Sequence, residues 1–157
     1  MRIAGATRAH VGPLARMLSR SPLLVRYGVT ERGARASLGE ALRARDIVLV
    51  ALDRGEVIGL AWLIVTRALD RTAYLRLLLV ADGRQSEGLG AALLAGGERR
   101  ARAAGCRHLA LLVTASNRRA RTFYSRHGYR SIGTLPDFVR PGIAEALYLK
   151  SWRARRR

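Results

Sequence analysis

The sequence predicts an α/β fold: a mixed, mostly antiparallel central sheet of about seven strands with helices on both faces. Short apolar runs of strand length alternate with amphipathic segments of helix length. Turn residues of the hairpin type join strands in the middle of the chain, whereas helical crossovers follow Val80 and Thr114. The predicted order is β-α-α-β-β-β-α-β-α-β-β, in a single domain over residues 1–151.

The first half of the chain is expected to hold one strand, two helices and then three strands. Asp53-Arg54-Gly55-Glu56 has the composition of a hairpin turn between two of these strands. Ser21-Pro22 separates the two helices. The expected strands span residues 2–6, 47–52, 57–66 and 74–81, and the expected helices span 9–20 and 30–44.

The second half is expected to alternate helices and strands before a final hairpin. Gly105 and Gly128 follow the two helical segments, in the position where glycine commonly ends a helix. Pro136 and Pro141-Gly142 are expected in the last connection. The helices are predicted at 88–104 and 118–127, the strands at 109–114, 129–135 and 144–151, and a basic tail at 152–157.

Composition points to a globular protein. The chain is 49% hydrophobic and 25% charged, and it holds no apolar run long enough to span a membrane. The N-terminus lacks the apolar core of a signal peptide. The single cysteine, Cys106, fits a reducing compartment, so a cytoplasmic location is expected. The three histidines are scattered without metal-ligand spacing, and no metal site is predicted.

The charge balance is unusual. Twenty-nine basic residues against eleven acidic ones give a net charge of +18. A GC-rich genome would favour arginine over lysine, but it does not account for the shortage of acidic residues. Such a charge attracts polyanions, which include nucleic acids, acidic surfaces and phosphate-rich cofactors. Nucleic acid is an unlikely partner, since the few aromatic residues are not interleaved with the basic ones.

The most informative segment is residues 77–94, where an apolar strand, a polar loop with three glycines and a helix follow one another. This order directs backbone N–H groups and the positive end of a helix toward one point, which favours phosphate binding. Gly88 and Gly90 leave room for close approach of a ligand to the backbone. The loop is not a P-loop, since no Lys-Ser or Lys-Thr follows, and it lacks the dinucleotide pattern GxGxxG.

A second block covers residues 117–129. On a helix, Ala120, Phe123, Tyr124 and His127 would share one face. That face therefore carries a phenol, Tyr124, where a helix that only packs would favour leucine. Judged by this helix alone, a tyrosine that only packs in the core is the better explanation.

Together the two blocks resemble the GCN5-related N-acetyltransferase (GNAT) superfamily. Its acyl-CoA signature, V-x-x-x-x-[QR]-x-x-G-x-[GA], is matched from Val80 through Gln85 and Gly88 to Gly90. Its second signature, N-x-x-A-x-x-x-Y-x-x-x-G-[FY], is matched at Asn117, Ala120, Tyr124, Gly128 and Tyr129. The order of elements also agrees with that family across essentially the whole chain.

The resemblance implies an enzyme that transfers an acetyl group from acetyl-CoA to a primary amine by direct attack in a ternary complex. Tyr124 would be the catalytic acid that protonates the leaving thiolate; a phenol, with an ordinary pKa of about 10, carries its proton at neutral pH. Main-chain groups of Leu78 and Val80 would bind the pantetheine arm. Arg126, and with less support Arg121 or Arg118, would meet the nucleotide phosphates. The implied cofactor-binding residues are Leu78, Leu79, Val80, Gln85, Ser86, Glu87, Gly88, Leu89, Gly90, Ala91, Asn117, Ala120, Phe123, Tyr124 and Arg126.

Arg76 departs from the family pattern, because several relatives place a glutamate there as general base. An arginine cannot take a proton from an ammonium group. By strand alternation Arg76 is expected on one face with Tyr74, Leu78 and Val80. Arg76, Trp62 and Tyr74 are the candidate substrate residues, Arg76 for an anionic group of the acceptor. The proton would then go to a water chain or to a residue elsewhere, with Glu31, Glu40, Asp70 and Asp137 as the candidates, or the amine would already lose it in solution.

Two alternatives remain open at this point. The first is an acyl-CoA-binding protein that has lost catalysis, suggested by Arg76. The second is a basic nucleic-acid-binding module, suggested by the net charge of +18. A homodimer is possible, since dimers are common among similar proteins.

Overall fold

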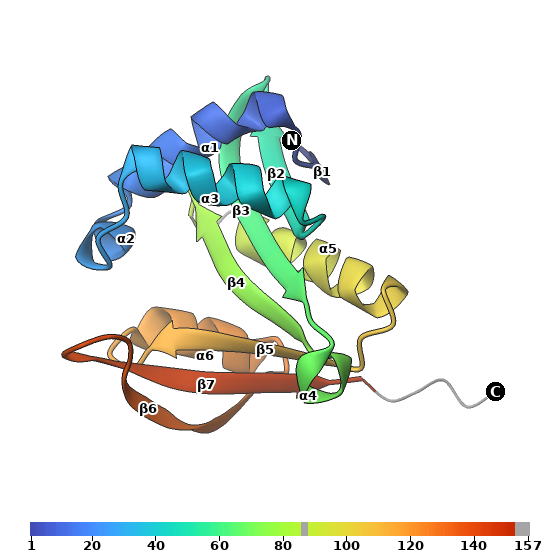
Figure 1. Ribbon diagram of the computed structural model, residues 1–157, viewed down its shortest axis with the longest axis vertical. Coiled ribbons are helices and arrows are strands. Elements are labelled where there is room, and N and C mark those ends of the chain that lie inside the picture. Colours follow the sequence, from blue (N-terminus) through green and yellow to red (C-terminus); the bar gives the residue numbers. More distant parts are fainter. Residues whose placement is uncertain (86–87, 153–157) are drawn as a thin grey trace.

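The protein is described by a computed structural model that covers residues 1–85 and 88–152. Within these residues, seven strands form one sheet in the order β1-β2-β3-β4-β5-β7-β6 (Figure 1). All neighbouring strands are antiparallel except β4 and β5. The predicted fold class is therefore confirmed. The strands are β1 (Arg2–Gly5), β2 (Ile47–Asp53), β3 (Glu56–Val65), β4 (Ala73–Val80), β5 (His108–Thr114), β6 (Arg130–Arg140) and β7 (Ile143–Ser151).

Helices cover both faces of the sheet. On one face, α1 (Arg8–Arg20) and α3 (Glu31–Arg43) lie side by side over β2, β3 and β4 (Figure 1). On the other face, α5 (Leu89–Ala103) and α6 (Arg118–Arg126) pack into a second apolar core. Two short helices were not predicted: α2 (Pro22–Arg26) and α4 (Ala68–Arg71). Each is shorter than the two turns that an amphipathic pattern needs to become visible.

Glycines bring α5 unusually close to the sheet. A Cβ atom at Gly97 would lie 2.8 Å from Leu63 Cδ1, and one at Gly59 would lie 2.8 Å from Leu93 Cδ1. Leu63 and Leu93 are fully buried, so neither can move away freely. This close packing holds α5 against β3, the strand that pairs with β4.

The final hairpin differs from the expectation that its first strand ends before Pro136. That expectation is wrong, because β6 continues to Arg140 and only Pro141-Gly142 forms the turn. β6 lies at the edge of the sheet, where a proline without an N–H group is tolerated. A register shift between Leu135 and Arg140, with Asp137 at φ 54°, absorbs the irregularity.

The parallel pair β4–β5 is short, and this opens the sheet. Pairing joins Ala73 to Leu109, Tyr74 to Ala110 and Leu75 to Leu111, and then stops. On its other side, β4 stays paired with β3 as far as Val80. Figure 1 shows the two strands diverging from the end near α4. The edge of β4 that faces β5 is therefore without a strand partner from residue 76 to residue 80, within the described part of the chain.

Candidate active site

The divergence begins at a β-bulge. Trp62 of β3 pairs with Leu77, whereas the next residue, Leu63, pairs with Leu75, so Arg76 is the extra residue. Because of the bulge, Leu78 and Val80 pack toward α5 and α6, whereas Leu77 packs toward α1 and α3. The expectation that Arg76 shares a face with Leu78 and Val80 is wrong, because it assumed strict alternation.

The glycine loop leads from β4 into the N-terminus of α5. Gly88 has φ 75°, a conformation that residues with side chains rarely adopt, and it is the N-cap of the helix. No described residue accepts a hydrogen bond from the backbone N–H groups of Leu89, Gly90 or Ala91. These donors suit a phosphate oxygen. Ser86 and Glu87, also predicted to bind cofactor, lie outside the described residues.

Two arginines anchor the middle of this loop, at the adjacent positions 84 and 85. Arg84 Nη2 donates to Asp53 Oδ2 at 3.0 Å, and this hydrogen bond is the main cause that lowers the pKa of Asp53. Arg119 Nη1 donates to Gln85 Oε1 at 2.7 Å. The loop is thus tied to the β2–β3 turn on one side and to the first turn of α6 on the other.

One face of α6 is turned toward the loop and the start of α5. A Cβ atom at Gly90 would lie 3.6 Å from Phe123 Cζ and 3.8 Å from Val80 Cγ2, so these residues meet at one point. Arg119, Phe123 and Arg126 share this face by their i, i+4, i+7 spacing. The sequence interpretation included Arg126 among the cofactor-binding residues but missed Arg119. Arg119 precedes Phe123 by four residues, and this spacing indicates that both lie on the same face of α6.

Tyr124 lies in the apolar core beneath α6. Its side chain is 8% exposed, and the rings of Phe123, Tyr129 and Tyr148 surround it, with centroids at 5.2, 5.6 and 6.5 Å. Burial raises the pKa of Tyr124 far above its ordinary value. None of the described residues hydrogen-bonds its hydroxyl, yet no buried polar side-chain atom among them lacks a partner. The hydroxyl therefore reaches solvent-accessible space.

Two other residues of the second block have structural contacts. Asn117 is the N-cap of α6, where its Oδ1 accepts a hydrogen bond from the Ala120 N–H at 3.1 Å. Arg121 donates to Tyr148 Oη at 3.2 Å and to the Ala115 carbonyl at 3.1 Å. Arg121 therefore braces α6 against the end of β5 and against β7.

The three candidate substrate residues lie together on the α1 side of the sheet. The Arg76 guanidinium stacks on the Trp62 ring, 4.9 Å from its centroid. The indole N–H of Trp62 donates to Asp46 Oδ2 at 2.8 Å and holds the ring in place. Burial raises the pKa of Tyr74, Glu145 adds to this and Arg76 opposes it. Arg76 and Glu145 therefore both lie near the phenol.

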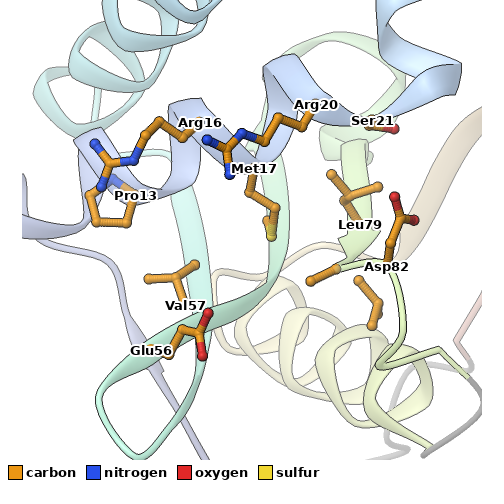
Figure 2. A pocket seen from close by; sticks show the side chains of 11 residues that line it. Pro13, Arg16, Met17, Arg20, Ser21, Glu56, Val57, Leu79 and Asp82 are labelled. Atoms are coloured by element: carbon orange, nitrogen blue, oxygen red, sulfur yellow. The ribbon is translucent and has the colours of Figure 1, made fainter.

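A pocket of about 320 Å³ borders the end of β4 on the same side (Figure 2). Met17, Val57 and Leu79 contribute apolar surface, while Arg16 and Arg20 of α1 and Glu56 and Asp82 supply charge of both signs. It provides space beside Leu79 and Val80, two of the predicted cofactor-binding residues.

The expected candidates for a general base have other surroundings. Glu31 pairs with Arg35 at 2.8 Å on the exposed surface of α3. Asp70 pairs with Arg107 at the closed end of the β4–β5 pair, and Asp137 accepts the Gly142 N–H in the last turn. Glu40 is exposed. The acidic residue that the sequence interpretation missed is Glu145 of β7, which is buried.

The described residues contain no cluster of three or more metal-ligating side chains. Among their helices, none has the length and apolar character needed to cross a bilayer.

Several solved structures with this fold are described as N-acetyltransferases. A ribosomal-protein-alanine N-acetyltransferase from Brucella melitensis superposes with a TM-score of 0.80 at 21% identity, covering 97% of this chain and 100% of the other. An aminoglycoside 6'-N-acetyltransferase complexed with coenzyme A gives 0.81 at 18%, covering 100% of both chains. An N-acetyltransferase from Thermoplasma acidophilum in complex with coenzyme A gives 0.78 at 17%, covering 96% and 98%. No curated protein matches the chain in sequence.

The sequence itself identifies the family. The profile of the acetyltransferase (GNAT) family matches residues 18–129, which is more than half of the chain. The chain therefore belongs to this family.

Proposed function

We propose that the protein transfers an acetyl group from acetyl-CoA to a primary amine by direct attack in a ternary complex. The proposal rests on two features that lie close together: the edge of β4 that has no strand partner, and the buried phenol of Tyr124. Between them, Val80, Gly90 and Phe123 lie in contact with one another. Family membership supports acetyl-CoA as the co-substrate.

The donors at the start of α5 fit a diphosphate. Leu89, Gly90 and Ala91 present N–H groups without protein acceptors, and Arg119 brings a positive charge to Gln85. The polar main-chain groups of Leu78 and Val80 fit an extended amide-containing arm, because β4 lacks a partner strand there. Arg126 lies on the same face of α6 as Arg119 and adds charge for the nucleotide phosphates.

When bound, acetyl-CoA supplies an activated acetyl group, which forms a C–N bond to the amine as its C–S bond breaks. Tyr124 then donates its hydroxyl proton to the departing sulfur, and the proton that the nitrogen loses as the amide forms returns to the phenolate through solvent. The raised pKa of Tyr124 keeps the phenol protonated until this moment. Arg76, fixed over Trp62, binds an anionic group of the acceptor, and Tyr74 lines the same cleft.

The substitution Tyr124→Phe tests this proposal. It keeps the packed ring and removes the acid, so we expect turnover to fall by about 100-fold or more, with acetyl-CoA affinity within about twofold of wild type. Release of free CoA with a panel of peptide N-termini, lysine peptides, amino acids, polyamines and aminoglycosides measures turnover, and calorimetry measures affinity. Unchanged turnover would contradict the role of Tyr124. Tight acetyl-CoA binding without acetylation of any amine would favour the non-catalytic alternative.

Arg76→Gln tests the acceptor contact separately. We expect KM to rise for amines that carry a carboxylate or phosphate and to stay constant for amines without one. An equal effect on both groups would argue against a contact with an anion.

A further inference from the structure

Glu145 is the only acidic side chain that is buried in the described part of the chain, at 3% exposed. The protein holds 29 basic residues against 11 acidic ones, yet none of the described cations forms an ion pair with Glu145. Glu98, whose side chain is 15% exposed, pairs with Lys150 Nζ at 2.8 Å. A buried carboxylate without a cation is costly, and a cationic ligand would offset that cost.

A short hydrogen-bond chain holds one oxygen of Glu145. The Tyr27 hydroxyl donates to Glu145 Oε1 and lies 2.6 Å from Thr114 Oγ1. A phenol has one proton, so the Thr114 hydroxyl is the donor to Tyr27. Burial and the bond to Glu145 both raise the pKa of Tyr27, which keeps its proton in this position.

The second oxygen of Glu145 is open. No described residue donates to Oε2, and no buried polar side-chain atom among the described residues lacks a partner. Oε2 must therefore reach solvent-accessible space. The carboxylate is fixed through one oxygen and presents the other to whatever enters that space.

That space lies at the opening of the sheet. Glu145 pairs in register with Thr114, the last residue of β5. Its neighbour Ala146 packs toward Tyr124 and α6, so Glu145 points to the opposite face of the strand. The charge of Glu145 acts on Tyr74 of β4, which places it near the strand across the divergence. Tyr124 and Glu145 thus belong to opposite faces at one opening.

We propose that Glu145 binds the ammonium group of the acceptor and takes its proton. The inference rests on the proposed acetyltransferase function. It assigns to Glu145 the role of general base, which an arginine at position 76 cannot fill. An N–H bond of the ammonium breaks, its electron pair stays on nitrogen, and the proton forms an O–H bond at Oε2. The proton then leaves to water through the same opening. Tyr27 and Thr114 are positioning residues that orient the carboxylate.

The charged and titratable residues around Glu145 belong to three parts of the fold: the end of α2, strand β4 and strand β6. Tyr27 and Arg26 lie at the end of α2, and Tyr74 and Arg76 lie on β4. Arg140 of β6 packs against Gly28, next to Tyr27. These arginines lie close to the residues around Glu145, so we expect them to disfavour a second positive charge on the acceptor near the reacting ammonium.

The first experiment is the pH dependence of kcat/KM for Glu145→Gln. We expect a loss of about 100-fold near pH 7. In the variant, kcat/KM should then rise about tenfold per pH unit as the amine loses its proton in solution. The loss should be larger for a lysine side chain, with a pKa of about 10.4, than for a peptide α-amine of about 8. A uniform loss at every pH, or none, would overturn the assignment.

Glu98→Gln is the matched control. Glu98 also accepts a hydrogen bond from a tyrosine hydroxyl, that of Tyr129 at 2.8 Å, but it has Lys150 as a partner and lies within α5. We expect this variant to lose stability and to keep the wild-type pH profile. The same change of profile in both variants would count against Glu145.

The second experiment does not depend on turnover. Butylammonium is titrated calorimetrically into the CoA-saturated wild type and into CoA-saturated Glu145→Gln, and we expect at least about tenfold weaker binding by the variant. Equal binding would overturn the inference, even if the wild type acetylates amines. If Glu145→Gln does not fold, Tyr27→Phe replaces it. That variant keeps the carboxylate but removes its donor, so the acidic limb of the profile should move to higher pH; an unmoved limb would contradict the proposal.

Discussion

Arg119 Nη1 donates a 2.7 Å hydrogen bond to Gln85 Oε1 and so links the first turn of α6 to the loop that precedes α5. The two residues are 34 positions apart in the sequence. This contact makes the geometry of the loop depend on α6, the helix that also carries Tyr124.

Loss of this link should weaken cofactor binding. We expect Arg119→Ala to raise the Kd for CoA about tenfold, because a charge-assisted hydrogen bond contributes roughly 1.5–3 kcal/mol. Arg99→Ala removes the same charge from the exposed end of α5 and serves as the control. Calorimetric titration with CoA measures both, and equal effects would point to net charge rather than to the link.

We expect Asn117 to affect both stability and CoA binding through its role as the N-cap of α6. We expect Asn117→Ala to lower the free energy of unfolding by about 1 kcal/mol and to weaken CoA binding, since Arg119 lies in the helix turn that the cap orders. Asn117→Asp retains an oxygen acceptor and should restore both properties. Denaturant unfolding and CoA titration report them. If Asn117→Asp is stable but binds CoA poorly, the amide N–H₂ contacts the cofactor directly.

Alkaline pH should destabilise the protein through its buried phenols. The pKa values of Tyr27, Tyr74, Tyr124 and Tyr129 are all raised, with burial as the main cause. The folded state therefore binds these protons more tightly than the unfolded state. That stabilisation is complete below about pH 10, the ordinary tyrosine value, and is lost as the pH rises above it. Thermal unfolding together with tyrosinate absorbance checks this; titration of all the tyrosines near pH 10 without unfolding would contradict it.

Two helical glycines should respond to alanine with opposite signs. Gly97→Ala places a Cβ atom 2.8 Å from Leu63 Cδ1, so we expect a loss of about 1–3 kcal/mol. Gly39→Ala in α3 meets only the Arg43 guanidinium, at 3.6 Å, and should gain about 0.5–1 kcal/mol from helix propensity. Denaturant unfolding of the two variants gives the comparison, and a stabilised Gly97→Ala would show that α5 can shift away from β3.

Much of this fold follows from local patterns, and the errors arise where tertiary contacts decide. Apolar runs predict the strands, and glycines after the amphipathic segments predict where the long helices end. These elements could be predicted because they depend on residues that are neighbours in the sequence. The face of Arg76 depends on a bulge, which appears only when β3 pairs with β4. Pro136 lies within β6 because the strand is at an edge.

The candidate site divides in the same way. The glycine loop and Tyr124 belong to contiguous motifs, so the sequence contains their signal. Glu145 belongs to none, and its partner Tyr27 is 118 residues away. Its burial and its missing counter-ion emerge only when α2, β5 and β7 come together.

The sheet is in effect two half-sheets joined by a seam of three residue pairs between β4 and β5. A bound chain of amides along the free edge of β4 would act as a guest strand that completes the seam. Ligand binding should then do more than fill a site: it should clamp the β1–β4 half to the β5–β7–β6 half. Amide protons near the seam would exchange more slowly in the complex, in both halves at once.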